Sequence, residues 1–303
     1  MRALAAGICC SLALGLASTT GTAEPRAERE PRRIDGLAAL RHLERLVAIG
    51  PRPAGSPGSV RAREYIVNEL KRSGVQARVE AFDADTPHGR LPMANVVGVV
   101  PGRRTDVILI GGHYDTKWFA DIRFVGANDG GSSTALLLEL ARQLRRAPGE
   151  FTYWIVFFDG EEARGEWSAR DSLYGSRRMA ETLQRRGRLP RAVIVVDMIG
   201  DRDLAIRRES LSTRWLTDLI WESARRLGRQ HHFLSETEAV EDDHAPFLRL
   251  GVPAALLIDF DFPSWHTTED TLDKVSDRSL QVVGDVLLHA LPAIEAHLMR
   301  PAR

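Results

Sequence analysis

Two adjacent carboxylates, Glu161 and Glu162, stand just beyond the end of an apolar run over residues 153–158. The run is rich in β-branched and aromatic residues, which predicts a strand buried on both faces. Gly160 breaks the run before the glutamates. Because neighbouring residues at a strand exit point in different directions, one carboxylate is able to bind a metal ion while the other stays free as a base. The pair therefore indicates metal-assisted chemistry, although acidic residues in loops are common.

Other residues of metal-binding type follow other predicted strands. They are His113 and Asp115 after residues 107–110, Asp129 in the next loop, Asp197 after residues 192–196, and His266 in the segment after residues 254–258. Sites in open α/β sheets lie beyond the carboxyl ends of the strands. A histidine-plus-carboxylate set without cysteine is typical of a catalytic Zn²⁺ with three protein ligands and an open position. The set predicts a zinc site.

Each of these residues also has an ordinary structural interpretation. His113 alone fits a buried, hydrogen-bonded histidine. Asp129 alone fits the N-cap of a helix that begins near Ser132, and Asp197 alone fits a turn at the end of a strand. The coincidence of all of them at strand ends favours the metal site.

The elements that must position these residues alternate along the chain. Helical periodicity is predicted for residues 37–47, 59–72, 132–145, 172–186, 213–227, 245–250 and 277–298, and strands for residues 77–82, 94–100, 107–110, 153–158, 192–198 and 254–258. This alternation predicts a three-layer α/β fold with a mixed, mostly parallel central sheet and helices on both faces. No linker divides residues 34–303, so we expect them to form a single catalytic domain.

Composition excludes some classes of partner. The 303 residues carry a formal net charge of zero, and 44% of them are hydrophobic. This is an ordinary globular composition, and without a basic excess we expect no nucleic-acid partner. We expect the protein to be a monomer.

The amino terminus differs from the rest. Met1 and Arg2 precede an apolar stretch over residues 3–17, which gives way to small polar residues and then to charge. This pattern predicts a signal peptide over residues 1–23 and a flexible leader over residues 24–33, so that the protein is exported to the periplasm or secreted. The apolar stretch is short for a bilayer span, and we expect none in the mature chain. An uncleaved anchor is the alternative. Both cysteines, Cys9 and Cys10, lie in this segment, so no disulfide is expected after its removal.

Four motifs carry a family resemblance. They are His113-Tyr-Asp115, Gly126-Ala-Asn-Asp129, Phe157-Phe-Asp-Gly-Glu-Glu162 and Trp265-His266. From about residue 35 onwards the chain resembles the zinc aminopeptidase-like metallohydrolases. In that superfamily, di-zinc aminopeptidases use the equivalents of all five ligands, whereas animal-type glutaminyl-peptide cyclotransferases bind one zinc through the equivalents of Asp129, Glu162 and His266. All five ligands are present here, so the ligands alone do not distinguish an aminopeptidase from a cyclotransferase.

The surrounding residues favour the cyclotransferases. Trp167-Ser168, residues 171–177, residues 241–253 and Trp265 all resemble that branch. The resemblance implies conversion of N-terminal glutamine in peptides or proteins to pyroglutamate, with release of ammonia. It further implies that Glu161 carries the proton, that Asp242 and Asp197 hydrogen-bond the reacting nitrogens, and that apolar side chains wall the pocket. The expected wall residues are Trp167, Trp265 and Phe262.

Three departures from that branch stand out. Leu256 occupies the position of a histidine in the animal cyclases, which makes the role of Asp242 less secure. Gly112 and Thr134 occupy the neighbourhood of a disulfide found in secreted animal members. The loop before Trp265 is one residue shorter, which changes the shape of the pocket.

Two other functions stay open. In a two-zinc aminopeptidase, His113 and Asp197 would hold a second metal and Glu161 would activate water. A catalytically inactive binding module on the same fold is the third possibility, and the intact Glu161 and the complete ligand set argue against it.

Overall fold

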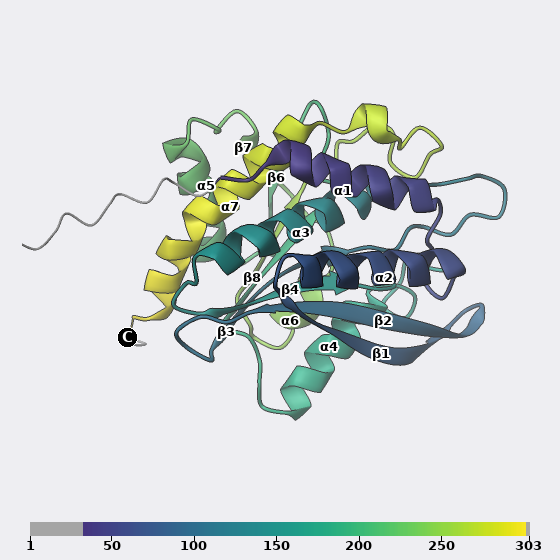
Figure 1. Cartoon of the computed structure of the whole chain (residues 1–303), viewed down its shortest axis with the longest axis horizontal. Coiled ribbons are helices and arrows are strands. Elements are labelled where there is room, and N and C mark those ends of the chain that lie inside the picture. The colour runs from purple at the N-terminus through teal and green to yellow at the C-terminus, as the bar shows by residue number, and fades with distance from the viewer. Residues whose placement is uncertain (1–32, 301–303) are drawn as a thin grey trace, which may run out of the picture. The chain divides into compact units, whose positions relative to one another are not determined.

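A six-stranded sheet forms the centre of the fold in the computed structural model, which describes residues 33–300 (Figure 1). The strands are β1 (Gln76–Thr86), β2 (Gly89–Val100), β3 (Val107–His113), β4 (Thr152–Phe158), β5 (Ala192–Asp197) and β8 (Ala254–Ile258). Their order across the sheet is β1-β2-β4-β3-β5-β8. Strands β4, β3, β5 and β8 run parallel to one another, whereas β1 and β2 form an antiparallel hairpin at one edge, and β2 pairs antiparallel with β4.

Helices cover both faces of this sheet. The helices are α1 (Gly36–Ile49), α2 (Pro57–Arg72), α3 (Gly131–Arg146), α4 (Tyr174–Arg185), α5 (Arg214–Arg226), α6 (Ala245–Leu248) and α7 (Asp277–Leu298), with a 3₁₀ turn at Leu272–Lys274. One core cluster joins the sheet to α1, α2, α3, α5 and α7, and a second joins its other face to α4 and α6. The three-layer, mostly parallel α/β fold predicted from the sequence is therefore confirmed.

The central strands are buried because their sequences are continuously apolar. All six residues of β5 and all five of β8 are buried, as expected for parallel strands covered on both faces. The edge strand β1 instead alternates between exposed and partly buried residues. Crossovers that contain helices then bring the carboxyl ends of β3, β4, β5 and β8 to one edge of the sheet, where the site lies.

The sequence did not predict a small second sheet. It consists of β6 (Ile206–Glu209) and β7 (Phe233–Glu238), which pair in parallel. Their polar sequences lack the apolar pattern of a buried strand, and only Ile206, Glu209 and Phe233 of the pair are buried. Among the described residues, no helix combines the length and the apolar character needed to cross a bilayer. The predicted signal peptide lies outside the described residues, as does most of the predicted leader.

Candidate metal centre and active site

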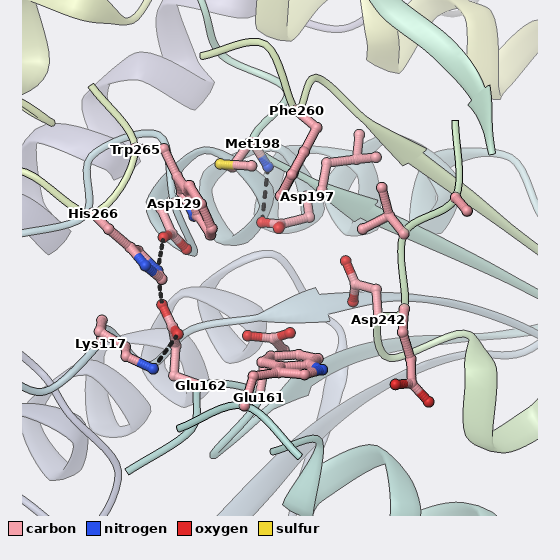
Figure 2. Close-up of a pocket in the computed structure, with 15 residues that line it drawn as sticks. Lys117, Asp129, Glu161, Glu162, Asp197, Met198, Asp242, Phe260, Trp265 and His266 are labelled. Atoms are coloured by element: carbon pink, nitrogen blue, oxygen red, sulfur yellow. Dashed lines mark hydrogen bonds and ion pairs between the residues drawn. The ribbon is translucent and has the colours of Figure 1, made fainter. Parts of the chain in front are cut away.

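The predicted ligands come together at the carboxyl ends of the parallel strands (Figure 2). His113 and Asp197 end β3 and β5, Glu162 follows β4, and His266 follows β8. Asp129 lies just before α3. Figure 2 shows Asp129, Glu162 and His266 at one side of a pocket and Asp242 at the opposite side, with Glu161 and Asp197 between them.

Two groups of possible metal ligands share Asp129. In the first group, His266 Nε2 lies 3.1 Å from Glu162 Oε1 and 3.3 Å from Asp129 Oδ2. In the second, His113 Nε2 lies 3.1 Å from Asp197 Oδ1 and 3.3 Å from Asp129 Oδ1. Within each group, the ligand atoms all lie within 4.8 Å of one another. Asp129 thus presents one oxygen to each group, so it does not serve as a cap of α3.

The first group fits zinc. Ligand atoms held about 2.0–2.2 Å from a zinc ion at tetrahedral angles lie roughly 3.3–3.5 Å apart, close to the separations found here. Asp129 Oδ2 is buried and accepts no hydrogen bond among the described residues. One imidazole and two carboxylates also match the donors of catalytic zinc sites.

The carboxyl groups of the site are buried close to one another. Burial raises the pKa of Glu162 to about 7, and the neighbouring Asp129 adds to the shift. Burial likewise raises the pKa of Asp242 to about 7, with a further contribution from Asp197. The pKa of Glu161 lies well above its ordinary value because of burial, an effect that His113 partly opposes. Such a concentration of buried carboxyl groups suits a divalent cation, which neutralises their charge.

The same carboxylates raise the pKa of the two histidines, because they stabilise the protonated imidazolium form. Burial alone would lower the pKa of His266, but Asp129 and Glu162 outweigh it and raise that pKa to about 9. Burial would also lower the pKa of His113, yet Asp197 and the other nearby carboxylates raise it well above its ordinary value. Asp129 is the counterpart: burial would raise its pKa, but the two histidines hold it below its usual range.

The pocket beside these ligands has a volume of about 380 Å³. Three aromatic side chains on its wall are substantially exposed: Trp167 at 43%, Trp265 at 40% and Phe260 at 39%. Trp265 stacks on His266, with ring centroids 4.2 Å apart, and also packs against Phe260. Aromatic walls of this kind exclude water and favour a compact substrate group.

Phe262 lies elsewhere than expected. It is only 4% exposed and belongs to the core cluster that contains Phe247 and Ile258, whereas Phe260 lines the pocket. Residues two apart share a face only in an extended strand, and a turn at Phe260 and Asp261 sends the two phenyl rings in different directions.

Comparison with known proteins places the chain in a family. Residues 95–291 match the model of peptidase family M28. The chain belongs to this family. It is 32% identical over 274 residues to the glutaminyl-peptide cyclotransferase of Boiga irregularis, covering 77% of this chain and 74% of that protein. It is 30% identical over 279 residues to the Drosophila melanogaster glutaminyl-peptide cyclotransferase, covering 81% and 79%. The crystal structure of an Acidobacteriales bacterium glutaminyl cyclase superimposes with a TM-score of 0.85 at 41% identity, covering 91% of this chain and all of that one.

In this M28 protein, the exit from β4 sets the directions of the two glutamates. The backbone N–H of Glu161 donates to Asp115 Oδ1 at 3.1 Å, and the Glu161 carbonyl accepts from the N–H of Leu173. Gly160 has φ of +70°, and a Cβ there would lie 2.6 Å from the sulfur of Met93. Only glycine fits this left-handed position without strain. The turn leaves Glu162 in a ligand group and Glu161 on the pocket wall outside both groups.

Asp270 positions Asp129 and was not predicted from the sequence. Its two carboxylate oxygens accept from the backbone N–H groups of Asn128 and Asp129 at 2.7 and 3.1 Å. The side chain is fully buried, and burial, together with the charge of Asp129, raises the pKa of Asp270 to about 7. The one available signal was an acidic residue four positions after His266, in a loop with several other polar residues.

Lys117 is a second residue that sequence reasoning missed. Its Nζ lies 3.8 Å from Glu162 Oε2, and the side chain lines the pocket. Sequence offered a signal here, because only three lysines occur in a chain whose other basic residues are arginines, and Lys117 follows Asp115 closely.

Leu256, the residue that replaces the animal histidine, is fully buried in the core cluster on the α4 and α6 face. It makes no polar side-chain contact. Whatever holds Asp242 in place in this protein must therefore come from other residues.

A buried arginine joins the loops around Asp129. Arg52 is fully buried and donates hydrogen bonds to the carbonyl oxygens of Tyr114, Val125 and Gly126 at 2.7, 2.5 and 2.7 Å. Burial lowers its pKa to about 10, and nearby aspartates keep the side chain cationic. Arg52 thus connects the loop before α2 to the segment after β3 and to the loop that precedes Asp129 and α3.

Replacing Arg52 with methionine is expected to lower the free energy of unfolding by about 3–5 kcal/mol, because three buried carbonyl groups lose their partner. Urea unfolding followed by circular dichroism measures this. Arg90→Met is the control: the Arg90 side chain is 71% exposed and pairs with Asp83 on the surface, so a change within about 0.5 kcal/mol is expected. A comparably small effect for both variants would contradict the role given to Arg52.

Proposed function

We propose that this M28 protein is a zinc-dependent glutaminyl cyclase that converts the N-terminal glutamine of peptides and proteins to pyroglutamate. The observation that carries the proposal is the pocket itself, in which Glu161 and Asp242 face a zinc-type ligand group between tryptophan walls. The named cyclotransferases and cyclases to which the chain is similar support the same activity.

The reaction is an intramolecular aminolysis. The free α-amine attacks the γ-amide carbon of the same residue, a carbon–nitrogen bond forms to close the ring, and the bond to the side-chain nitrogen breaks to release ammonia. A zinc ion held by Asp129, Glu162 and His266 would supply Lewis-acid polarisation of the γ-amide oxygen.

In the proposed reaction, Glu161 carries the proton. It lines the pocket without belonging to either ligand group, so its carboxylate is available to the substrate. It takes a proton from the attacking amine and returns it to the leaving nitrogen. Asp242 and Asp197 also line the pocket and accept hydrogen bonds from the reacting nitrogens. Trp167 and Trp265 confine the side chain in the folded-back conformation that ring closure requires.

One zinc ion per chain is proposed, in the first ligand group. In this assignment His113 and Asp197 form a hydrogen-bonded pair that fixes Asp129 and the pocket wall. A two-zinc aminopeptidase is the second candidate, and one observation favours it: the ligand atoms of His113, Asp129 and Asp197 also lie close enough together to hold an ion.

Two activity assays and a count of bound zinc separate the candidates. The proposal predicts ammonia release from a glutamine-initiated peptide, no amino acid release from an aminoacyl amide, and loss of turnover on chelation with recovery when zinc is restored. Two tightly bound zinc ions per chain, together with release of free amino acid and no pyroglutamate, would contradict the cyclase assignment.

We also propose that the protein is exported and acts as a monomer. Export rests on the sequence pattern of residues 1–23. Amino-terminal sequencing of the mature protein and its sedimentation behaviour test these two points.

A further inference from the structure

The segment that carries Asp242 has little regular structure of its own. Residues 239–244 connect β7 to α6, and Ala239, Val240, Glu241 and Asp242 all line the pocket. Asp242 is 2% exposed, and its carboxylate lies on the pocket wall opposite the zinc-type ligand group (Figure 2). Side-chain contacts from outside the segment must therefore fix the place of Asp242.

Glu209, the last residue of β6, contacts this segment on both sides of Asp242. Its Oε1 accepts from the backbone N–H of Val240 at 3.4 Å, and its Oε2 lies 3.1 Å from His244 Nε2. The side chains of Glu209 and His244 are both fully buried. Among the described residues, Glu209 is the one hydrogen-bond partner of the His244 ring, since Nδ1 has none.

Glu209 is itself held firmly. Its carboxylate also accepts from the backbone N–H of Leu211 and from the hydroxyl of Ser212, each at 2.8 Å. The Ser212 hydroxyl in turn accepts from the backbone N–H of Leu256 in β8 at 3.0 Å. The segment is thereby connected to the central sheet through one carboxylate.

The charge on Glu209 fits this arrangement. Burial alone would raise the pKa of Glu209, but hydrogen bonds from His244 and from neighbouring groups hold it below its usual range. A buried glutamate and histidine contribute little net stability, because their desolvation offsets their attraction. The pair acts instead by holding residues 239–244 in one conformation.

We propose that Glu209 is a positioning residue for cyclisation, which holds residues 239–244 through Val240 and His244 and so fixes Asp242 against the reacting nitrogens. The proposal rests on the cyclase function proposed above. It concerns a residue outside the pocket, whose contribution passes entirely through Asp242.

The test uses Glu209→Gln, which keeps the size of the side chain and removes its charge. We expect kcat for a glutamine-initiated peptide to fall about 10- to 100-fold with KM little changed, because a catalytic group is displaced while the rest of the pocket is intact. Zinc content should stay at the wild-type level.

A double-mutant cycle with Asp242→Asn distinguishes positioning from general structural damage. If Glu209 acts through Asp242, adding Glu209→Gln to the Asp242→Asn variant causes no further loss of kcat. Multiplying losses, or an unchanged kcat in Glu209→Gln alone, would overturn the proposal. His244→Leu is expected to give the same loss and the same lack of additivity, and it decides the matter should Glu209→Gln not fold.

Glu295→Gln is the matched control. Glu295 is also a buried glutamate that joins segments, accepting from the N–H of Phe151 at 3.0 Å and the hydroxyl of Tyr153 at 2.7 Å, beside the start of β4. It should lower thermal stability without changing kcat. A wild-type protein that forms no pyroglutamate would instead refute the proposed function itself, which separates the two failures.

Discussion

Glutamine in place of Glu161 is expected to lower kcat for a glutamine-initiated peptide by about 10²- to 10⁴-fold, the usual contribution of a positioned general acid–base. The variant keeps the shape of the pocket but has no carboxylate to take the proton from the amine. Because Glu161 lies outside both ligand groups, the protein should still bind zinc and unfold at the wild-type temperature.

Two controls accompany this variant. Glu166→Gln changes an exposed glutamate in the same loop and should leave kcat unchanged. Glu162→Gln alters a proposed zinc ligand and should lose zinc as well as activity. Turnover in Glu161→Gln within a few-fold of wild type would contradict the role of Glu161 as proton carrier.

Removal of His266 is expected to have the second large effect. The His266→Ala variant should lose bound zinc and at least about 10³-fold in kcat, because a neutral donor leaves the ligand group and the Lewis acid leaves with the metal. Its ring packs against Trp265, Phe119 and Phe124, and its backbone has φ of +56°, an uncommon conformation for a non-glycine residue. A strained backbone conformation persists only where the surrounding structure stabilises it, and such positions are frequent at functional sites.

Metal analysis of His113→Ala shows which ligand group holds the ion. With one zinc in the first group, this variant keeps about one equivalent of metal, and the exposed His231 replaced by alanine does too. A fall from two equivalents to one in His113→Ala would contradict the single-zinc proposal and favour the aminopeptidase.

That the candidate ligands meet at one edge of the sheet was predictable from sequence for a physical reason. Parallel strands that alternate with helices all end at the same edge of the sheet, so residues following separate strands meet there. That argument locates His113 and Asp197, which end β3 and β5, and Glu162, which closely follows β4. It does not locate His266, which lies in an irregular loop well beyond the end of β8 and was recognised from the resemblance of Trp265-His266 to the family motif. It also predicted the layers of the fold, because the apolar runs of β4, β5 and β8 are continuous.

Features set by irregular backbone were not predictable in this way. Phe260 lines the pocket in place of the expected Phe262 because of a single turn. The hydrogen bonds made by Asp270 and Arg52 depend on which loops, distant in sequence, lie next to each other. A buried arginine within a run of turn residues gives no sign in the sequence that it will bind three carbonyl groups. The β6–β7 sheet was not predicted for a related reason: Arg207 and Arg208 interrupt the apolar pattern that would indicate a strand.

One measurement tests the cyclase assignment most directly. The zinc-loaded protein is incubated with a glutamine-initiated peptide whose side-chain amide carries a heavy nitrogen isotope, and both the peptide and the released nitrogen are followed by mass spectrometry. The predicted result is heavy ammonia together with a peptide of full length, lighter by one ammonia and without a free α-amine. Release of intact labelled glutamine with a peptide one residue shorter, or formation of an uncyclised glutamate, would contradict it.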